Sequence, residues 1–138
     1  MDLKGILSIK IVRGGVKACD FFIFIQELIH SDQDRFLKGK VALFMDRASI
    51  HKSKKFMKKF VKVYTGVYNA PYTPHLNPIG FAFAKIKGIV QKTKPSDERS
   101  LIQAIIQSCN EVSEKEAANY VLHTLRHTKM AIDGDDFF

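Results

Sequence analysis

The sequence has no tryptophan, only two cysteines, and fewer acidic than basic residues. Cys19 and Cys109 are too few and too far apart to build the disulfide framework of a small secreted domain, which favours a reducing intracellular compartment. No uninterrupted apolar run reaches the roughly 18 residues that a membrane-spanning helix needs, and the N-terminus lacks the apolar segment of a signal peptide. We therefore expect a protein that is neither secreted nor inserted in a membrane.

The composition is that of a folded, basic domain. With 138 residues, of which 46% are hydrophobic, the chain is long enough to bury the core of one domain. Lys and Arg outnumber Asp and Glu by 22 to 14, which gives a formal net charge of +8. Such a charge favours a polyanionic partner, but by itself it says nothing about the chemistry of a site.

One short apolar run places an acid where ligand sites are often found. The run Val41–Met45 predicts a buried strand, and Asp46 follows it directly. Ligand sites of open α/β sheets lie at the carboxyl ends of strands, so Asp46 is a candidate metal ligand. The alternative is a strand-end Asp that caps the next helix, and the residues alone leave both interpretations open.

Two segments carry a resemblance to a known family. Asp46 opens Asp-Arg-Ala-Ser-Ile-His, which ends at His51; residues 71–79 contain Pro-Tyr-Thr-Pro and Leu-Asn-Pro-Ile, and Lys-Ile-Lys follows at 85–87. In this order and spacing the segments resemble two motifs of the catalytic domain of DDE transposases of the Tc1/mariner and IS630 types. The resemblance implies an RNase H-like α/β fold, with Asp46 at the place of the middle acid and with His51 ordering the loop after it.

The other two acids of the family have no match here. Gly80 stands where the family has its third acid, and Phe83 where it has Trp. In the family the first acid lies on the opening strand, and it precedes the middle acid by more residues than separate Asp2 from Asp46. Asp2 is therefore too close to be the first acid, and we expect Asp20 to start a helix. Two-metal phosphoryl transfer needs several carboxylates to hold two ions roughly 3.5–4 Å apart. We therefore expect a domain that is not an enzyme, with no metal and no cofactor, in which Asp46 is vestigial.

A lysine-rich helix, predicted to begin after the N-cap Ser53, is the best candidate for a DNA-binding surface. The candidate DNA-binding residues are Lys52, Lys54, Lys55, Lys58, Lys59 and Lys62. Cations arranged in this way release counterions when they meet phosphates, although an ordinary solvated helix face has the same pattern. Tyr64, Tyr68 and Tyr72 lie near this segment, and either stack on bases or belong to the core or its rim.

Two histidines near the C-terminus form a candidate metal pair. His123 and His127 stand at the i, i+4 spacing that can ligate zinc. No Cys, Asp or Glu nearby in the sequence supplies the other ligands, so we interpret them as a surface pair. His75 replaces a variable residue of the family turn and carries no prediction.

The expected fold is a truncated RNase H-like α/β fold, with a small mixed sheet of about three strands packed by helices and a helical C-terminal part. The strands are predicted at residues 6–12, 41–45 and near 67, and residues 31–39 as a polar connection. Helices are predicted from Asp20, from Ser53, between Ile79 and Pro95, from Ser96 to Cys109, and from a capping box at Ser113 to about Leu125. Residues 1–131 are expected to form the domain, and residues 132–138 an acidic mobile tail.

These observations favour a degenerate, domesticated DDE domain that acts as a non-catalytic subunit of a nuclear DNA-associated complex. Its expected partners are other protein subunits, in an obligate hetero-complex, and the phosphate backbone of DNA. A partner is expected because the family's opening strand, which pairs with the strand of the middle acid, has no counterpart here and would leave backbone groups unpaired. The alternatives are an active metal-dependent nuclease or transposase completed by another chain, and a protein-interaction module without DNA contact.

Overall fold

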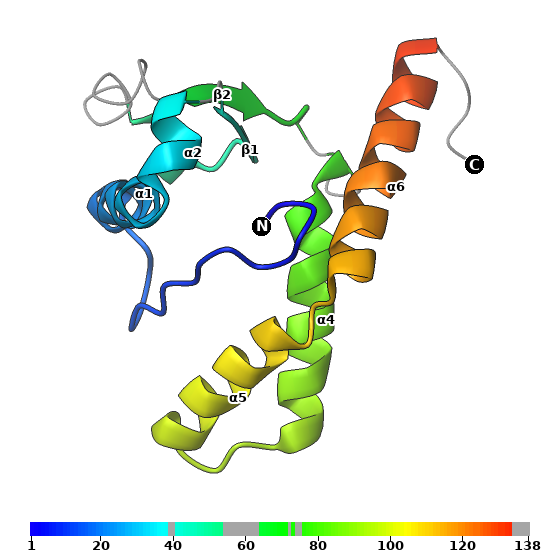
Figure 1. Cartoon of the computed structure of the whole chain (residues 1–138). Helices are drawn as coiled ribbons and strands as arrows, with labels where there is room; N and C mark the ends of the chain where they lie inside the picture. The colour runs from blue at the N-terminus through cyan, green and yellow to red at the C-terminus, as the bar shows by residue number, and fades with distance from the viewer. Residues whose placement is uncertain (39–40, 54–63, 72, 74–75, 134–138) are drawn as a thin grey trace. The chain divides into compact units, whose positions relative to one another are not determined.

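The computed structural model describes residues 1–38, 41–53, 64–71, 73 and 76–133 (Figure 1). The chain forms two compact units. The sheet unit consists of Lys10–Thr73, and the helical unit consists of Met1–Ile9 together with Pro74–Phe138. None of the described helices combines the length and the apolar character that crossing a membrane requires.

The sheet unit is built from short elements around one pair of strands. In chain order these are α1 (Ala18–Ser31), α2 (Gln33–Lys38), β1 (Val41–Met45), the short 3-10 helix η1 (Ser49–Lys52) and β2 (Tyr64–Tyr68). The two strands are parallel, with Val41 opposite Tyr64 and Met45 opposite Tyr68. Parallel pairing brings the carboxyl ends of both strands to the same edge, so residues that follow β1 and β2 are neighbours.

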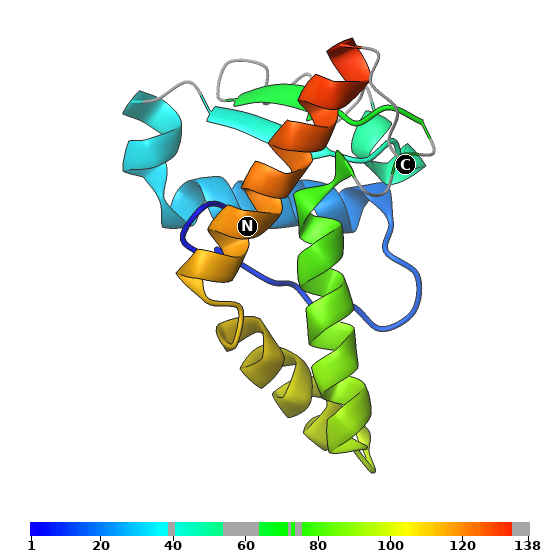
Figure 2. The same cartoon turned by 90° about the vertical axis from the view of Figure 1, so that its right-hand side faces the viewer.

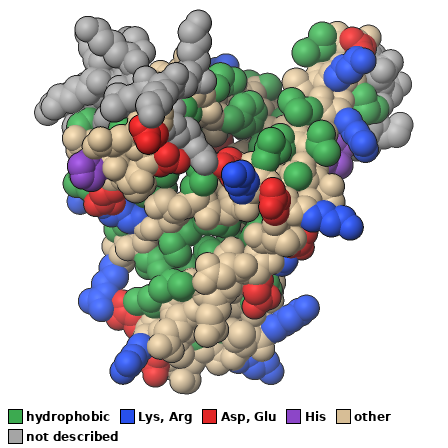
Figure 3. Space-filling model, in the orientation of Figure 1, with side chains coloured by type: hydrophobic (Ala, Val, Ile, Leu, Met, Phe, Trp, Pro, Cys, Tyr) green, Lys and Arg blue, Asp and Glu red, His purple; other side chains and the backbone are tan. Residues whose placement is uncertain are grey.

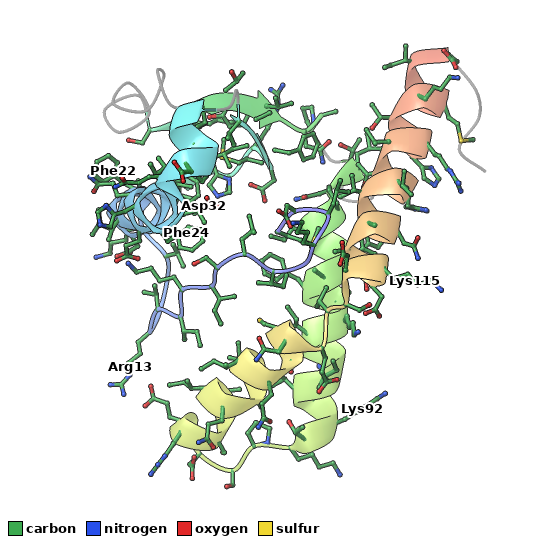
Figure 4. All side chains as sticks on the ribbon, in the orientation of Figure 1. Arg13, Phe22, Phe24, Asp32, Lys92 and Lys115 are labelled. Atoms are coloured by element: carbon green, nitrogen blue, oxygen red, sulfur yellow. The ribbon has the colours of Figure 1, made fainter. Side chains whose placement is uncertain are left out.

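The core of the sheet unit lies between α1 and one face of this strand pair. Ile25, Met45 and Tyr64 are buried there, and aromatic residues of α1 pack against them. Figure 4 shows two of these aromatics, Phe22 and Phe24, on α1. Because side chains alternate along a strand, the other face carries Phe44 and its partner Val67, which are exposed.

The helical unit consists of α4 (Pro78–Thr93), α5 (Glu98–Asn110) and α6 (Glu114–Asp133). Helix α4 contacts both others, and Figures 1 and 2 show α5 beside its C-terminal half and α6 beside its N-terminal half. The most buried positions are small, with Ala82, Ser108 and Ala117 each at 0% exposure, which allows the helix backbones to approach closely.

The helix boundaries follow from local chemistry. Lys94 ends α4 in the left-handed conformation, at φ 47°, one residue before Pro95. Asp97 caps α5 by accepting a hydrogen bond from the Ser100 N–H at 2.7 Å, and the bonds from Ser100 hold the pKa of Asp97 below its ordinary value. The predicted capping box of α6 is confirmed, because the Ser113 N–H donates to Glu116 Oε2 at 3.0 Å and the Glu116 N–H to Ser113 Oγ at 3.3 Å.

The mixed α/β class is confirmed, but the prediction of a strand at residues 6–12 is wrong. The described part of the chain has two strands in its sheet and, near the N-terminus, an isolated bridge between Asp2 and Gly5. Leu7, Ile9 and Ile11 are all about two-fifths exposed. Their alternating apolar pattern is not enough, because a strand also needs a neighbour to receive its backbone hydrogen bonds.

Three smaller boundaries also differ from expectation. Helix α1 begins before Asp20, whose Oδ2 instead accepts the Lys17 N–H at 2.8 Å from the third helical position. Residues 31–39, predicted as a connection, contain α2, and α6 continues to Asp133. The predicted lysine-rich helix after Ser53 and residues 134–138 of the predicted tail lie outside the described residues.

Candidate functional site

Asp46 lies directly after β1, at the edge where both strands end. Its Oδ1 accepts a hydrogen bond from the Ala48 N–H at 3.0 Å and lies 2.8 Å from His51 Nδ1. The first contact closes a turn around Arg47 in the loop after β1. Asp46 does not cap η1, because the N-cap of that helix is Ala48 and no side chain makes a capping bond there. The side chain of Asp46 remains 54% exposed, and both contacts use the same oxygen.

His51 is held by two elements of the sheet unit, α1 and β2. Its ring contacts the ring of Phe21 on α1 with centroids 4.5 Å apart, and its carbonyl oxygen accepts the Tyr68 hydroxyl of β2 at 2.8 Å. The side chain is only 18% exposed. The expectation that His51 orders the loop after Asp46 is therefore confirmed by its contacts, since a fixed imidazole holds the carboxylate in one position.

The exits of the two strands are joined by a second set of bonds. Asn69, the residue after β2, is buried and donates its backbone N–H to Met45 O at 2.9 Å. The Arg47 Nε–H donates to Asn69 O at 2.9 Å, and the Asn69 side chain donates to Thr73 O at 2.6 Å. Sequence reasoning missed Asn69, although a polar residue directly after a predicted strand was the same signal that drew attention to Asp46.

Gly80, the residue at the place of the third acid, is the third residue of α4. It is exposed, and its N–H donates to Asn77 O at 2.9 Å as part of the first helical turn. A glycine brings no carboxylate to this helix end. The described end of the second motif, from Leu76 onward, therefore starts a helix without presenting a carboxylate at position 80.

Lys85, which belongs to the end of the second motif, has a partner within the helical unit. Its Nζ lies 2.7 Å from both carboxylate oxygens of Glu116 and 2.6 Å from Glu111 O. The hydrogen bond from Lys85, followed by bonds from Ser113, lowers the pKa of Glu116 to about 2. Lys85 thus ties α4 to the turn between α5 and α6.

The metal centre of the family requires a set of acids that these residues do not supply. A two-metal centre needs several carboxylates around one point. In the described ranges, no three His, Cys, Asp or Glu side chains come together as a possible metal site. Asp46 offers one carboxylate and Gly80 none, so the described residues do not fit a two-metal centre.

The remaining predicted site residues divide between the core, the surface and the undescribed segments. Tyr64 is buried, and its burial, followed by the proximity of Tyr68, raises its pKa to about 12. It is a core residue and does not face a base. Lys52 is exposed at the end of η1. The other candidate lysines and Tyr72 lie outside the described residues.

His123 and His127 lie together on α6, with ring centroids 4.2 Å apart. His123 also belongs to a surface pocket of about 360 Å³ between α4 and α6. The pocket is lined by Phe81, Asn119, Tyr120, Leu122, His123 and Arg126. Sequence reasoning missed this pocket, because Phe81 comes from another helix and His123 was considered only as a member of a surface pair.

Comparisons with known proteins agree with the fold and with the motifs. A family model described as "DDE superfamily endonuclease" matches residues 1–102. The structure described as "Structure of Mos1 transposase catalytic domain and Raltegravir with Mn" is similar to this chain with a TM-score of 0.83 and 14% sequence identity. The similarity covers 100% of this chain and 74% of that one, and at this identity it shows the fold alone. No curated protein matches. Because the family model covers well over half of the sequence, the chain belongs to the DDE superfamily of endonucleases.

Proposed function

We propose that this chain is a non-catalytic, domesticated transposase-derived subunit of a nuclear DNA-associated complex, in which it contributes DNA binding, scaffolding or both. The observation that carries the proposal is Gly80, the exposed third residue of α4, at the place of the family's third acid. A missing carboxylate cannot be replaced by the glycine backbone N–H, which is a donor and is already bonded to Asn77 O.

The contacts of Asp46 support a local role for the acid that remains. Its Oδ1 binds both His51 Nδ1 and the Ala48 N–H, so the carboxylate fixes the loop after β1. A lone carboxylate holds Mg²⁺ weakly and mainly through water, because this ion keeps most of its hydration shell. Asp46 therefore has a structural use that does not depend on a metal ion.

The charge of the chain supports DNA as a partner. Basic residues exceed acidic ones by eight, and five lysines are concentrated in residues 54–62. Around α5 in the helical unit, by contrast, basic side chains stand among acidic ones (Figure 3). The two cysteines are free, which fits a reducing compartment, and a DNA partner in such a compartment favours the nucleus.

Two observations favour other functions. The 54% exposure of Asp46, at a strand end and beside an ordered His51, would suit an active nuclease that receives further acids from another chain. The exposed pair Phe44 and Val67 on the outer face of the strand pair would suit a protein-interaction module without DNA contact. The experiments that follow distinguish both from the proposed function.

The first experiment tests catalysis directly. The full chain and its Asp46→Ala variant are incubated with supercoiled plasmid in Mg²⁺ or Mn²⁺, alone and with the proteins that co-purify with the native chain. We expect no nicking in any combination. Metal-dependent nicking by the wild type that disappears in Asp46→Ala would contradict the proposal and favour the completed nuclease.

The second experiment tests DNA binding through its salt dependence. Duplexes of unrelated sequence should bind alike, and removing one lysine that binds a phosphate should reduce the slope of log K against log salt by roughly 0.9. The double variant Lys55→Glu/Lys59→Glu should therefore weaken binding to all duplexes. The matched control is Lys92→Glu/Lys115→Glu, since Figure 4 shows these side chains extending away from α4 and α6.

Equal reductions of affinity in the two double variants would show that only net charge matters, and unchanged binding in both would favour the protein-interaction module. The subunit role is tested by expressing the chain alone and with its co-purified partner, and by imaging the tagged protein in cells. We expect self-association of the isolated chain, rescue by the partner, and nuclear signal. A monodisperse, cooperatively melting monomer would contradict the obligate complex.

A further inference from the structure

The pocket between α4 and α6 has no role in the function proposed above. It lies entirely within the helical unit, and its volume of about 360 Å³ is near the lower end of the range of roughly 300–1,000 Å³ that small-molecule sites occupy. We propose that this pocket, which we call the aromatic pocket, binds a single unstacked nucleotide of DNA. That the nucleotide belongs to DNA rests on the proposed function, whereas the fit of a nucleotide to the pocket follows from the lining residues alone.

One wall of the aromatic pocket is a set of packed rings. The rings of Phe81 and Tyr120 are stacked, with centroids 5.7 Å apart and an interplanar angle of 23°. His123 meets Phe81 edge-on, with centroids 5.1 Å apart at 88°. Each of these rings is held by a neighbour from the other helix, so the wall is fixed before a ligand arrives. A nucleobase is the planar ligand that stacks on such a wall without regard to its sequence.

The lining also carries polar groups that suit a nucleotide. Arg126 offers a planar guanidinium that binds a phosphate through two parallel hydrogen bonds, and in the described part of the chain it forms no ion pair that would compete. Asn119 offers a donor and an acceptor to the edge of a base. No carboxylate lines the pocket, so nothing in its lining repels a phosphate.

Stacking on the rings determines which form of DNA the pocket can bind. A base inside a duplex has both faces covered by its neighbours and cannot lie on a protein ring. The aromatic pocket therefore requires a base that has left the stack, as in a single strand, a frayed end or a distorted duplex.

The experiment compares ligands and matched variants of the full chain by fluorescence anisotropy. The ligands are a labelled dT12, the same oligomer with abasic residues, and a blunt duplex. We expect Arg126→Gln to lower the affinity for dT12 about tenfold. We expect Lys115→Gln, which removes the same charge from α6 outside the pocket, to change it less than twofold. The abasic oligomer should bind the wild type about tenfold more weakly than dT12 does, because it has no base to stack on the rings.

Two further measurements separate this inference from the proposed function. Tyr120→Phe, which keeps the ring, should retain binding of dT12, whereas Tyr120→Leu should lower the affinity about tenfold. The melting curves of both variants show whether the fold is kept. NMR titration with deoxythymidine 5′-monophosphate should shift signals of Tyr120 and Arg126 even if duplex binding is absent, an outcome that would refute the DNA-binding role but support the pocket.

Several results would overturn the inference. Equal reductions of dT12 affinity in Arg126→Gln and Lys115→Gln would reduce the effect to net charge. Equal affinity of the abasic oligomer and dT12 would show that no base enters the pocket. If an acidic peptide with an aromatic side chain bound the pocket and no nucleotide did, the aromatic pocket would be assigned to a protein partner.

Discussion

Restoring an acid at Gly80 should make the protein more stable. Gly80 is exposed and occupies the third position of α4, where a glycine leaves the helix about 0.5–1 kcal/mol less stable than a better helix former. A carboxylate in the first helical turn also interacts favourably with the helix dipole, by about 0.3–1 kcal/mol. Gly80→Glu should therefore raise the free energy of unfolding by about 1–2 kcal/mol, which corresponds to a rise in Tm of about 3–7 °C.

Two control variants separate the two contributions. Gly80→Gln has the same length without the charge, so it should give only the propensity part. Gly88 lies in the middle of α4, and a Cβ added there has no atom within 4 Å, so Gly88→Ala should stabilise by about 1 kcal/mol through propensity alone. Urea unfolding in low and in 1 M salt tests the charge, because screening should abolish the difference between Gly80→Glu and Gly80→Gln.

A lower stability of Gly80→Glu, together with the expected gain in Gly88→Ala, would refute this reasoning. It would mean that the start of α4 needs a glycine for contacts of its own. The missing acid would then be a requirement of this fold, and not a change that the fold merely tolerates.

Three further predictions concern the two units. The hydrogen bond from Lys85 lowers the pKa of Glu116 from 4.5 to about 2, so its stabilising contribution should be complete above about pH 4.5 and lost as the pH falls toward 2; the difference in urea midpoint between wild type and Glu116→Gln should shrink over that window. The raised pKa of Tyr64 means that its contribution should be complete below pH 10 and lost as the pH rises through about 12, and the absorbance titration at 295 nm should lose its latest phase in Tyr64→Phe. Ile25→Ala should lower the free energy of unfolding by about 2–5 kcal/mol in urea titrations, because it leaves a cavity in the sheet unit, whereas Ile23→Ala, at an exposed position of the same helix, should lower it by less than about 1 kcal/mol.

The sequence predicted those helices whose ends are set by interactions between residues close together in the chain. Helices α4, α5 and α6 follow from apolar periodicity and from caps such as Asp97 and Ser113, which act within a few residues. The segment 6–12 has the composition of a strand, but whether it becomes one depends on a partner from elsewhere in the chain. Phe83, the aromatic residue at the place of the family's Trp, is 61% exposed, whereas its neighbour Ala82 is buried. The periodicity of apolar residues predicts that a helix has an apolar face, but the packing of the helices decides which residues of that helix are buried.

The candidate sites divide in the same way. Asp46 and His51 are five residues apart, so a motif could predict their contact before any fold was known. Asn69 joins the same edge only because β2 runs parallel to β1, and Phe81 reaches Tyr120 only because α4 packs against α6. Contacts between distant segments require the fold, and these were the residues that sequence reasoning missed.

The contact of Lys85 with Glu116 affects how the signature of this family should be interpreted. Lys85 is a residue of the signature, yet its ammonium group is engaged by a carboxylate and a carbonyl of its own chain. Natural selection for folding alone would preserve such a lysine after cleavage had been lost. A genome survey that identifies nucleases by this part of the signature would therefore also collect chains in which the lysine serves only the fold, and should require an acid at the position of Gly80 as well.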